Sequence, residues 1–214
     1  MSDRAVDPVQ CAYRTARPPM WFVAAPALLF GYGVIRLFDG LDGEYGPGLA
    51  WTIGHLLFLS GIVLFGVVIV RLGRLVPATT TARRVTASVA VAIALAGVVA
   101  FVRVFVLDLV VGFLAADNAE MHMVRDDIGD FPSILPEAVW DLGPLLFMVG
   151  LLTLTVQLAV LHPRCLAAWS PVIIIVGFLC IMVNLNLLPV GAALFGLALA
   201  PAAWRPGWIG NSSS

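Results

Sequence analysis

The sequence predicts an all-α integral membrane protein, a bundle of six transmembrane helices with both termini in the cytoplasm. Three observations support this fold: 61% of the residues are hydrophobic, only 12% are charged, and the mean hydropathy is +1.00. Soluble domains carry about a quarter of their residues as charged side chains, so water cannot be the solvent for most of this surface. We expect one transmembrane domain at 19–204, between a cytoplasmic segment at 1–18 and a tail at 205–214.

Six apolar segments approach or exceed the roughly 20 residues that a helix needs to cross a bilayer. The expected spans are Pro19–Phe38, Leu49–Leu72, Val85–Ala115, Leu135–Leu161, Ala168–Val183 and Leu187–Ala203. The last two are short, and we separate them because Asn184–Pro189 forms a polar turn that a proline ends. No removable signal peptide is expected, since residues 1–18 are polar and lack an apolar core.

The distribution of arginine predicts the orientation, because short loops with excess positive charge stay in the cytoplasm. All 12 basic residues are arginine. In the six-span arrangement one side receives Arg4, Arg14, Arg17, Arg71, Arg74, Arg83, Arg84, Arg164 and Arg205. The acidic loops at 39–44 and 117–137 fall on the opposite side, which is therefore the outer one. Five spans would place Arg205 outside, so the charge pattern favours six.

Polar and ionisable residues within the predicted helices are the candidates for a functional site. A charged group near the bilayer core costs several kcal/mol unless it is paired or hydrated. The topology brings such groups to the outer half of the bundle from several helices: Tyr32, Arg36, His55, Arg103, Asp108, Glu137 and Asp141, with Asp39, Asn184 and Asn186 at the same level. We expect a polar cup that opens outward, and not a channel with polar walls from end to end.

Each candidate also has a structural interpretation that the sequence leaves open. Arg103 and Asp108 could pair with opposite charges on neighbouring helices, and Glu137 suits the first turn of a helix. The aromatic residues of the outer half, Trp51 and Trp140 among them, form either an interfacial belt or a pocket that stabilises a cation. The acidic loops resemble magnesium-binding clusters. The alternative is that these outer loops are acidic only because the arginines are confined to the cytoplasmic loops.

Some classes of partner are not expected. A net charge of -1, without a clustered basic face, gives no basis for nucleic-acid binding. The three cysteines form no metal-ligand spacing, so we interpret them as small apolar fillers. We predict neither a metal site nor a cofactor.

Five segments together carry a resemblance to known proteins: residues 36–43, 54–58, 103–108, 140–147 and 183–189. They resemble small bacterial polytopic membrane proteins, some of which are similar to the membrane-bound terpene cyclases of indole-sesquiterpene pathways, such as those of the drimentines and xiamycins. The resemblance implies a buried carboxylic acid that protonates an alkene or epoxide of a farnesyl-type chain. An apolar, aromatic-lined pocket then folds the chain and quenches the cation. Desolvation inside a membrane bundle suits such an acid.

The resemblance implies Asp108 and Asp141 as the acid or its partner, with Glu137 third. The substrate-binding residues would be Tyr32, Arg36, Asp39, Trp51, His55, Arg103, Trp140, Asn184 and Asn186. Our leading hypothesis is a cofactor-free, acid-initiated cyclase of the bacterial cytoplasmic membrane, acting on a prenylated lipophilic substrate that enters from the bilayer. The loop at 116–134 could be its lid.

Two other classes remain open. A small transporter or lipid-binding protein could use the same cup, with Asp108 or Asp141 carrying a proton. The lack of inverted repeats counts against a secondary transporter. A structural subunit, in which the charges only hold helices together, is the third hypothesis.

Overall fold

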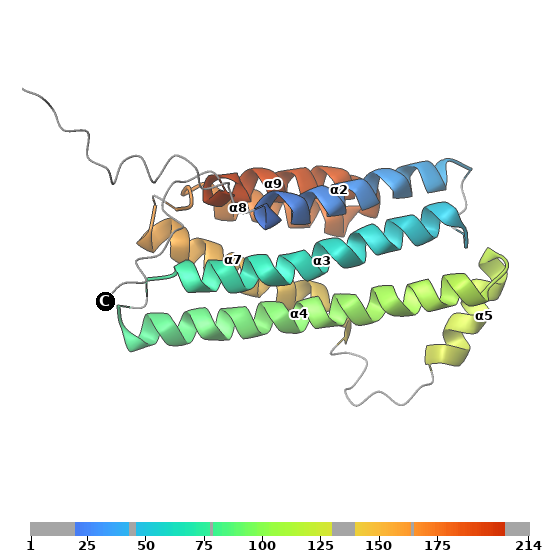
Figure 1. The fold of residues 1–214 in the computed structure, drawn as a ribbon, viewed down its shortest axis with the longest axis horizontal. Helices are drawn as coiled ribbons and strands as arrows, with labels where there is room; N and C mark the ends of the chain where they lie inside the picture. The colour runs from blue at the N-terminus through green and yellow to red at the C-terminus, as the bar shows by residue number, and fades with distance from the viewer. Residues whose placement is uncertain (1–19, 43–45, 78, 130–139, 164, 204–214) are drawn as a thin grey trace, which may run out of the picture.

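The computed structural model describes residues 20–42, 46–77, 79–129, 140–163 and 165–203, which form helices and turns without a strand among them. The helices are α2 (Trp21–Asp39), α3 (Leu49–Leu75), α4 (Thr81–Leu114), α5 (Asn118–Gly129), α7 (Gly143–Leu161), α8 (Ser170–Val183) and α9 (Leu188–Ala203), with 3-10 turns η1 (Gly40–Asp42) and η2 (Leu185–Leu187). The predicted all-α class is thereby confirmed. Six helices lie side by side, and α5 folds back beside the end of α4 (Figure 1).

Five segments are long and apolar enough to cross a membrane: α2, α3, α4, α7 and Leu185–Ala203, which joins η2 to α9. The chain is therefore a multi-pass membrane protein. Helix α8 has 14 residues, which at 1.5 Å per residue is about 21 Å. That length is less than the roughly 30 Å of a hydrocarbon core, so α8 by itself is shorter than a membrane span, unlike the other five segments.

Helix α7 begins later than the sequence predicts. The expected span starts at Leu135, but residues 130–139 lie outside the described residues and α7 itself runs from Gly143. Pro144 stands in its first turn, where proline is favoured because its missing N–H needs no partner. The proline thus sets the start of this helix, two residues after Asp141.

The six long helices form a ring. Neighbours along the ring are α2, α3, α4, α7, α8 and α9, and α9 packs back on α2; α7 and α8 share the smallest contact of these pairs. Small residues allow the close approach of α4 and α7, because a Cβ on Gly97 would lie 2.3 Å from the backbone nitrogen of Phe147. Likewise a Cβ on Gly150 would lie 2.5 Å from the carbonyl oxygen of Ala90. Such glycines are typical of helix contacts within membranes.

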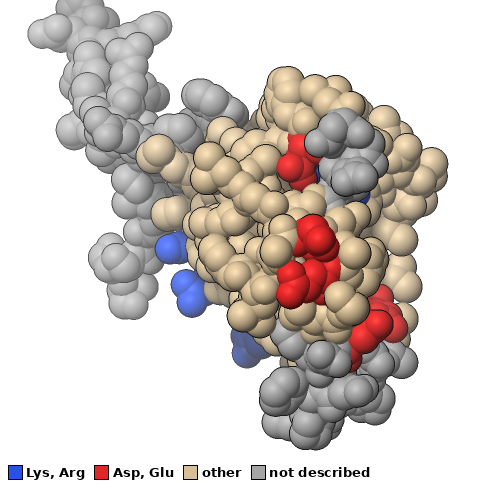
Figure 2. Space-filling model, turned by 90° about the vertical axis from the view of Figure 1, so that its right-hand side faces the viewer, with Lys and Arg blue, Asp and Glu red and all other residues tan. Residues whose placement is uncertain are grey.

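The two ends of the ring differ in charge and in packing. We call the end that carries α5 the acidic end, where the carboxylates of the described residues gather (Figure 2). The opposite end, at the turn between α3 and α4, is called the basic end, since it carries Arg71, Arg74, Arg83 and Arg84. Fully buried side chains such as Phe22, Phe65 and Leu72 fill the ring toward the basic end. Toward the acidic end the ring encloses a pocket.

Candidate functional site

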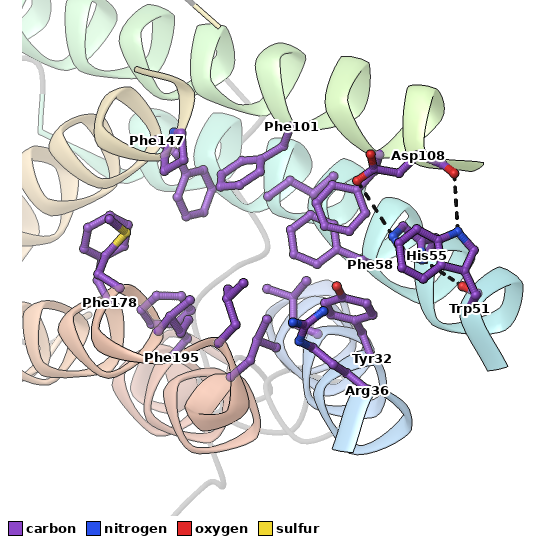
Figure 3. Close-up of a pocket in the computed structure, with 18 of the residues that line it drawn as sticks. Tyr32, Arg36, Trp51, His55, Phe58, Phe101, Asp108, Phe147, Phe178 and Phe195 are labelled. Atoms are coloured by element: carbon purple, nitrogen blue, oxygen red, sulfur yellow. Dashed lines mark hydrogen bonds and ion pairs between the residues drawn. The ribbon is translucent and has the colours of Figure 1, made fainter. Parts of the chain in front are cut away.

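A pocket of about 550 Å³ reaches from the acidic end into the middle of the ring (Figure 3). Its volume lies within the range of small-molecule sites. The polar lining residues are Tyr32, Arg36, Trp51, His55, Asp108 and Arg125. The apolar ones are Leu29, Phe58, Ile62, Phe101, Phe105, Pro144, Phe147, Phe178, Ile181, Met182, Leu185, Leu188 and Phe195. The pocket therefore has one polar end and a long apolar body.

Helical spacing explains how helices α3 and α4 present their side chains to this pocket. Positions three, four or seven residues apart lie on one face of a helix. On α3 the lining residues Trp51, His55 and Phe58 follow this spacing, and on α4 so do Phe105 and Asp108. Each helix thus contributes a stripe that is polar near the acidic end and apolar farther in.

Asp108 is the centre of the polar end. Its side chain is only 15% exposed, and it lies between two cationic or potentially cationic partners. Nη2 of Arg125 donates a hydrogen bond of 2.8 Å to Oδ1 of Asp108. Nε2 of His55 lies 3.8 Å from Oδ2, within ion-pair distance but longer than a hydrogen bond. The two carboxylate oxygens therefore face different partners.

The tautomer of His55 follows from its second contact. Nδ1 of His55 lies 2.8 Å from the backbone carbonyl oxygen of Trp51 (Figure 3). A carbonyl can only accept, so Nδ1 must carry a proton and donate it. In a neutral ring Nε2 would then present a lone pair to Asp108. The lone pair of Nε2 and the carboxylate of Asp108 repel each other. Their contact becomes attractive when a second proton binds, either to Nε2 of His55 or to the Asp108 carboxylate. The pair is therefore suited to hold a transferable proton.

Trp51 positions both members of this pair. Its indole Nε1–H donates to the backbone carbonyl of Asp108 at 3.3 Å, and its ring packs on the imidazole of His55 with the centroids 4.0 Å apart. The indole fits because Gly112 has no side chain: a Cβ there would lie 2.5 Å from Nε1 of Trp51. Gly112 follows Asp108 by one helical turn, so α4 supplies both the acid and the space for its neighbour.

Helix α5 supplies Arg125 from outside the ring. At its start the backbone N–H of Glu120 donates to Asp117, and the Glu120 carboxylate accepts from the N–H of Ala116, both at 2.8 Å. This reciprocal arrangement resembles a capping box, which fixes the beginning of a helix. Buried Met121 then packs against the end of α4. The Arg125 side chain is 60% exposed, so α5 brings a solvent-facing cation to a largely buried carboxylate.

Aromatic rings form the apolar wall nearest to the acid. Phe58 and Phe105 are stacked with centroids 3.6 Å apart and an interplanar angle of 6°. Tyr32 contacts them edge-on, at 5.2 Å from Phe58 and 5.7 Å from Phe105. Phe101 packs beside Phe58 at 5.6 Å. These rings come from three helices, so the wall depends on the assembled bundle.

A second group of rings lies deeper in the pocket wall. Phe65 is fully buried and does not line the pocket. It contacts Phe147 at 5.5 Å and Phe195 at 6.1 Å, and these two side chains do line the pocket. Phe65 therefore packs behind the part of the wall that Phe147 and Phe195 form.

The structure brings together five of the residues that the sequence singled out. Tyr32, Arg36, Trp51, His55 and Asp108 all line the pocket, from three different helices. They lie at the polar end of one pocket.

Other predicted residues lie elsewhere. The guanidinium of Arg103 lies over the ring of Trp140 at 4.7 Å, outside the pocket lining. Asp141 is exposed and does not line the pocket.

Three further candidates also fall outside the lining. Asp39 lines two neighbouring cavities, of about 10 Å³ and about 510 Å³, and the smaller one adjoins the main pocket at Tyr32 and His55. Asn184 accepts a 2.9 Å hydrogen bond from the N–H of Asn186, and both side chains are exposed, so they form the turn before α9. Glu137 lies outside the described residues.

Sequence reasoning missed Arg125 and the phenylalanines of the deeper pocket, Phe101, Phe147, Phe178 and Phe195. A signal for Phe101 was present, because it precedes Phe105 by four residues and Asp108 by seven on the same face of α4. No sequence pattern connects Arg125 to Asp108.

No protein-family model, curated protein or solved structure matches this chain. The fold and the site define a multi-pass helical membrane protein with an acid at the polar end of an aromatic pocket. Its function must be argued from that site.

Proposed function

We propose that this protein is a membrane-embedded terpene cyclase, an enzyme that closes rings in a lipophilic prenyl-bearing substrate by acid catalysis. One observation carries the proposal: Asp108, paired with His55, is the only carboxylate that the described residues place on the pocket, and the remaining wall is mainly apolar, with six phenylalanine rings. An acid at one end of an apolar cavity can deliver a proton while the cavity holds a flexible hydrocarbon chain. No cofactor is needed for this chemistry.

The proposed reaction is an isomerisation in which the proton is returned. The His55–Asp108 pair donates its proton to an epoxide oxygen or an alkene carbon at one end of the substrate. A lone pair of the epoxide oxygen takes up this proton, and the C–O bond then breaks with its electron pair passing to the oxygen; in an alkene, the π bond supplies the pair that takes up the proton. A tertiary carbocation remains in either case. A second alkene of the same chain attacks this cation and closes the ring. Loss of a proton from a neighbouring carbon to the deprotonated pair ends the reaction.

Arg125 favours an epoxide as the group that is protonated. Its hydrogen bond to Oδ1 favours the charged form of Asp108, and the proposal places the transferable proton on Nε2 of His55, opposite Oδ2. An imidazolium can protonate the basic oxygen of an epoxide far more readily than an alkene carbon, because the driving force for proton transfer depends on the match of acid and acceptor. The ring faces of Phe58 and Phe105 then stabilise the cation.

The location in the bilayer is part of the same proposal. We place six spans in the bacterial cytoplasmic membrane, with both termini in the cytoplasm and the acidic end outward. The arginines of the basic end support this orientation, since excess positive charge stays inside. The short helix α8 would be the sixth span, continued outward by Asn184 and η2.

The substrate would reach the pocket sideways from the lipid. Met182 and Leu185 line the pocket and are also 55% and 51% exposed on the outer surface of the bundle. Met182 lies at the end of α8 and Leu185 in the following turn η2, and α8 has the smallest contact with its ring neighbour α7. A lipophilic chain could therefore pass between these helices without leaving the bilayer.

A lipid-binding protein without turnover is the second candidate. The observation that favours it is the pair of guanidinium groups, Arg36 and Arg125, at the polar end of the pocket. Such an end would also hold an anionic head group. Transport through the bundle has less support, because Phe65 packs behind Phe147 and Phe195 of the pocket wall.

The test compares a farnesylated indole with its terminal epoxide, using the purified protein in detergent. We expect a ring-closed product of unchanged mass from the epoxide, and little from the unmodified chain. Asp108→Asn should abolish the product, while Asp126→Asn, a matched change at an exposed carboxylate of α5, should not. Binding of both compounds without conversion would favour the lipid-binding candidate. Equal conversion by Asp108→Asn and the unchanged protein would refute the proposed acid.

A further inference from the structure

A second cavity lies at the basic end of the bundle, opposite the polar end of the aromatic pocket, and its lining shares no residue with that pocket. It has a volume of about 280 Å³ and is formed between the last turns of α3 and the first turns of α4. Arg74 of α3 and Arg84 of α4 line it, together with the hydroxyl-bearing side chain of Ser88. Neither the proposed reaction nor the packing of the ring uses these residues.

The polar part of this cavity has an unbalanced positive charge. Arg74, Arg84 and Ser88 are exposed, and within the part of the chain that the structure describes neither arginine is ion-paired with a carboxylate. The beginning of α4 adds its own partial positive charge. Its cap, Thr80, already accepts from the N–H of Arg83 at 3.3 Å, so the local backbone is ordered. An anion would complement this charge.

The apolar part of the cavity lies on the side of the arginines that faces the middle of the bundle. Val70 precedes Arg74 by one turn of α3, and Val91 follows Arg84 by two turns of α4. The helices meet at Gly73, where an added Cβ would overlap Cγ2 of Val91. A ligand in this cavity would therefore have its charge at the helix ends and its apolar part along the valines.

We propose that this cavity binds an anionic phospholipid, with the phosphate held by Arg74, Arg84 and Ser88 and the first acyl carbons lying on Val70 and Val91. The order of polar and apolar residues matches a lipid better than a free anion. Basic pockets between transmembrane helices on the cytoplasmic side are typical head-group sites, and the proposed orientation puts this cavity there. The lipid site does not depend on the cyclase reaction.

The experiment measures lipid retention on the full chain by native mass spectrometry after exchange into detergent with phosphatidylglycerol or phosphatidylcholine. The unchanged protein should retain phosphatidylglycerol selectively. Arg74→Gln and Arg84→Gln should each weaken retention about fivefold, which corresponds to about 1 kcal/mol for each arginine. Arg83→Gln is the matched control, because it removes the same charge next to Arg84 at a residue outside the cavity lining; it should keep retention within about twofold.

Three outcomes would overturn the proposal. Equal loss in Arg83→Gln would show that only the overall charge of the basic end matters. Equal retention of phosphatidylcholine would show that the arginines do not select a head group. Competition by glycerol phosphate as strong as that by the whole lipid would show a free-anion site. Because the three arginines are exposed, all variants should fold, and thermal unfolding without added lipid checks this.

Discussion

Nη2 of Arg125 lies 2.8 Å from Oδ1 of Asp108, so a helix outside the ring reaches the carboxylate that the ring encloses. The two side chains differ strongly in exposure, 60% for Arg125 and 15% for Asp108. This contact balances the charge of Asp108 and leaves its other oxygen facing His55. The contact also holds α5 next to the polar end of the pocket, between that end and the outside of the bundle.

Arg125→Gln should impair turnover much more than it impairs folding. Without the guanidinium, Asp108 loses the partner that favours its charged form, and His55 loses the counter-charge for its proton. We expect kcat/KM for the epoxide to fall about tenfold, less than the roughly 100-fold to 10,000-fold that a general acid itself contributes, because Arg125 acts on the acid and not on the substrate. The free energy of unfolding should change by less than about 1 kcal/mol, because ion pairs with an exposed partner contribute little.

Turnover and chemical unfolding of the same preparation test this prediction. Arg103→Gln is a control for the loss of a guanidinium near the acidic end, since Arg103 does not line the pocket. A fall in activity that parallels a fall in stability would mean that Arg125 only holds α5 in place.

Asp108→Asn should distinguish the two carboxyls that the sequence leaves as candidate acids. The amide keeps the shape of the side chain but removes the negative charge that holds the proton on Nε2 of His55, so we expect product formation to fall about 100-fold or more. Asp141 is exposed and outside the pocket, so Asp141→Asn should have a much smaller effect. Single-turnover product formation measures both. A larger loss in Asp141→Asn would move the acid to the start of α7 and contradict our assignment.

The sequence predicts the helices well because hydropathy alone separates them. Five predicted spans correspond to helices long enough to cross a membrane. The prediction is less accurate at the ends of the helices. Pro144 sets the start of α7 at Gly143, and α8 ends where Asn184 caps the following 3-10 turn.

The sequence predicts at which level of the bundle the site residues lie, but only partly which way each side chain faces. Topology brings Asp108 and Asp141 to similar levels, but the side on which each residue faces depends on the packing of its helix. Asp108 follows Phe105 on a stripe that faces the pocket, whereas Asp141 precedes the start of α7 and is exposed. Arg125 was beyond prediction because its position depends on how α5 folds back, through Met121.

Gly112→Ala should displace Trp51 and disturb the acid indirectly. A methyl group at this position would lie 2.5 Å from Nε1 of Trp51, so the indole must move away from both Asp108 and His55. Forcing an extra carbon into a packed site costs about 1–3 kcal/mol. We expect lower thermal stability together with a fall in kcat.

A matched control shows whether the steric overlap is the cause. Gly66→Ala adds the same methyl group to α3, where its nearest neighbours would be 3.7 Å away, an ordinary contact. It should leave stability and turnover nearly unchanged. The smaller ring in a Trp51→Phe, Gly112→Ala double variant should recover part of the lost stability. If the double variant is less stable than either single one, the two residues do not compete for the same space.

Phe105→Leu should lower kcat more than it raises KM. The Phe105 ring stacks on Phe58 at 3.6 Å and lies on the wall next to Asp108, where the proposed cation forms. Leucine keeps an apolar surface for binding the hydrocarbon chain but has no π face. A desolvated cation–π contact contributes about 2 kcal/mol, so we expect kcat to fall roughly 30-fold. Phe113→Leu controls for the same change on α4, because Phe113 is 71% exposed and outside the pocket. If Phe105→Leu raises KM and leaves kcat unchanged, this ring binds the substrate chain without stabilising the cation.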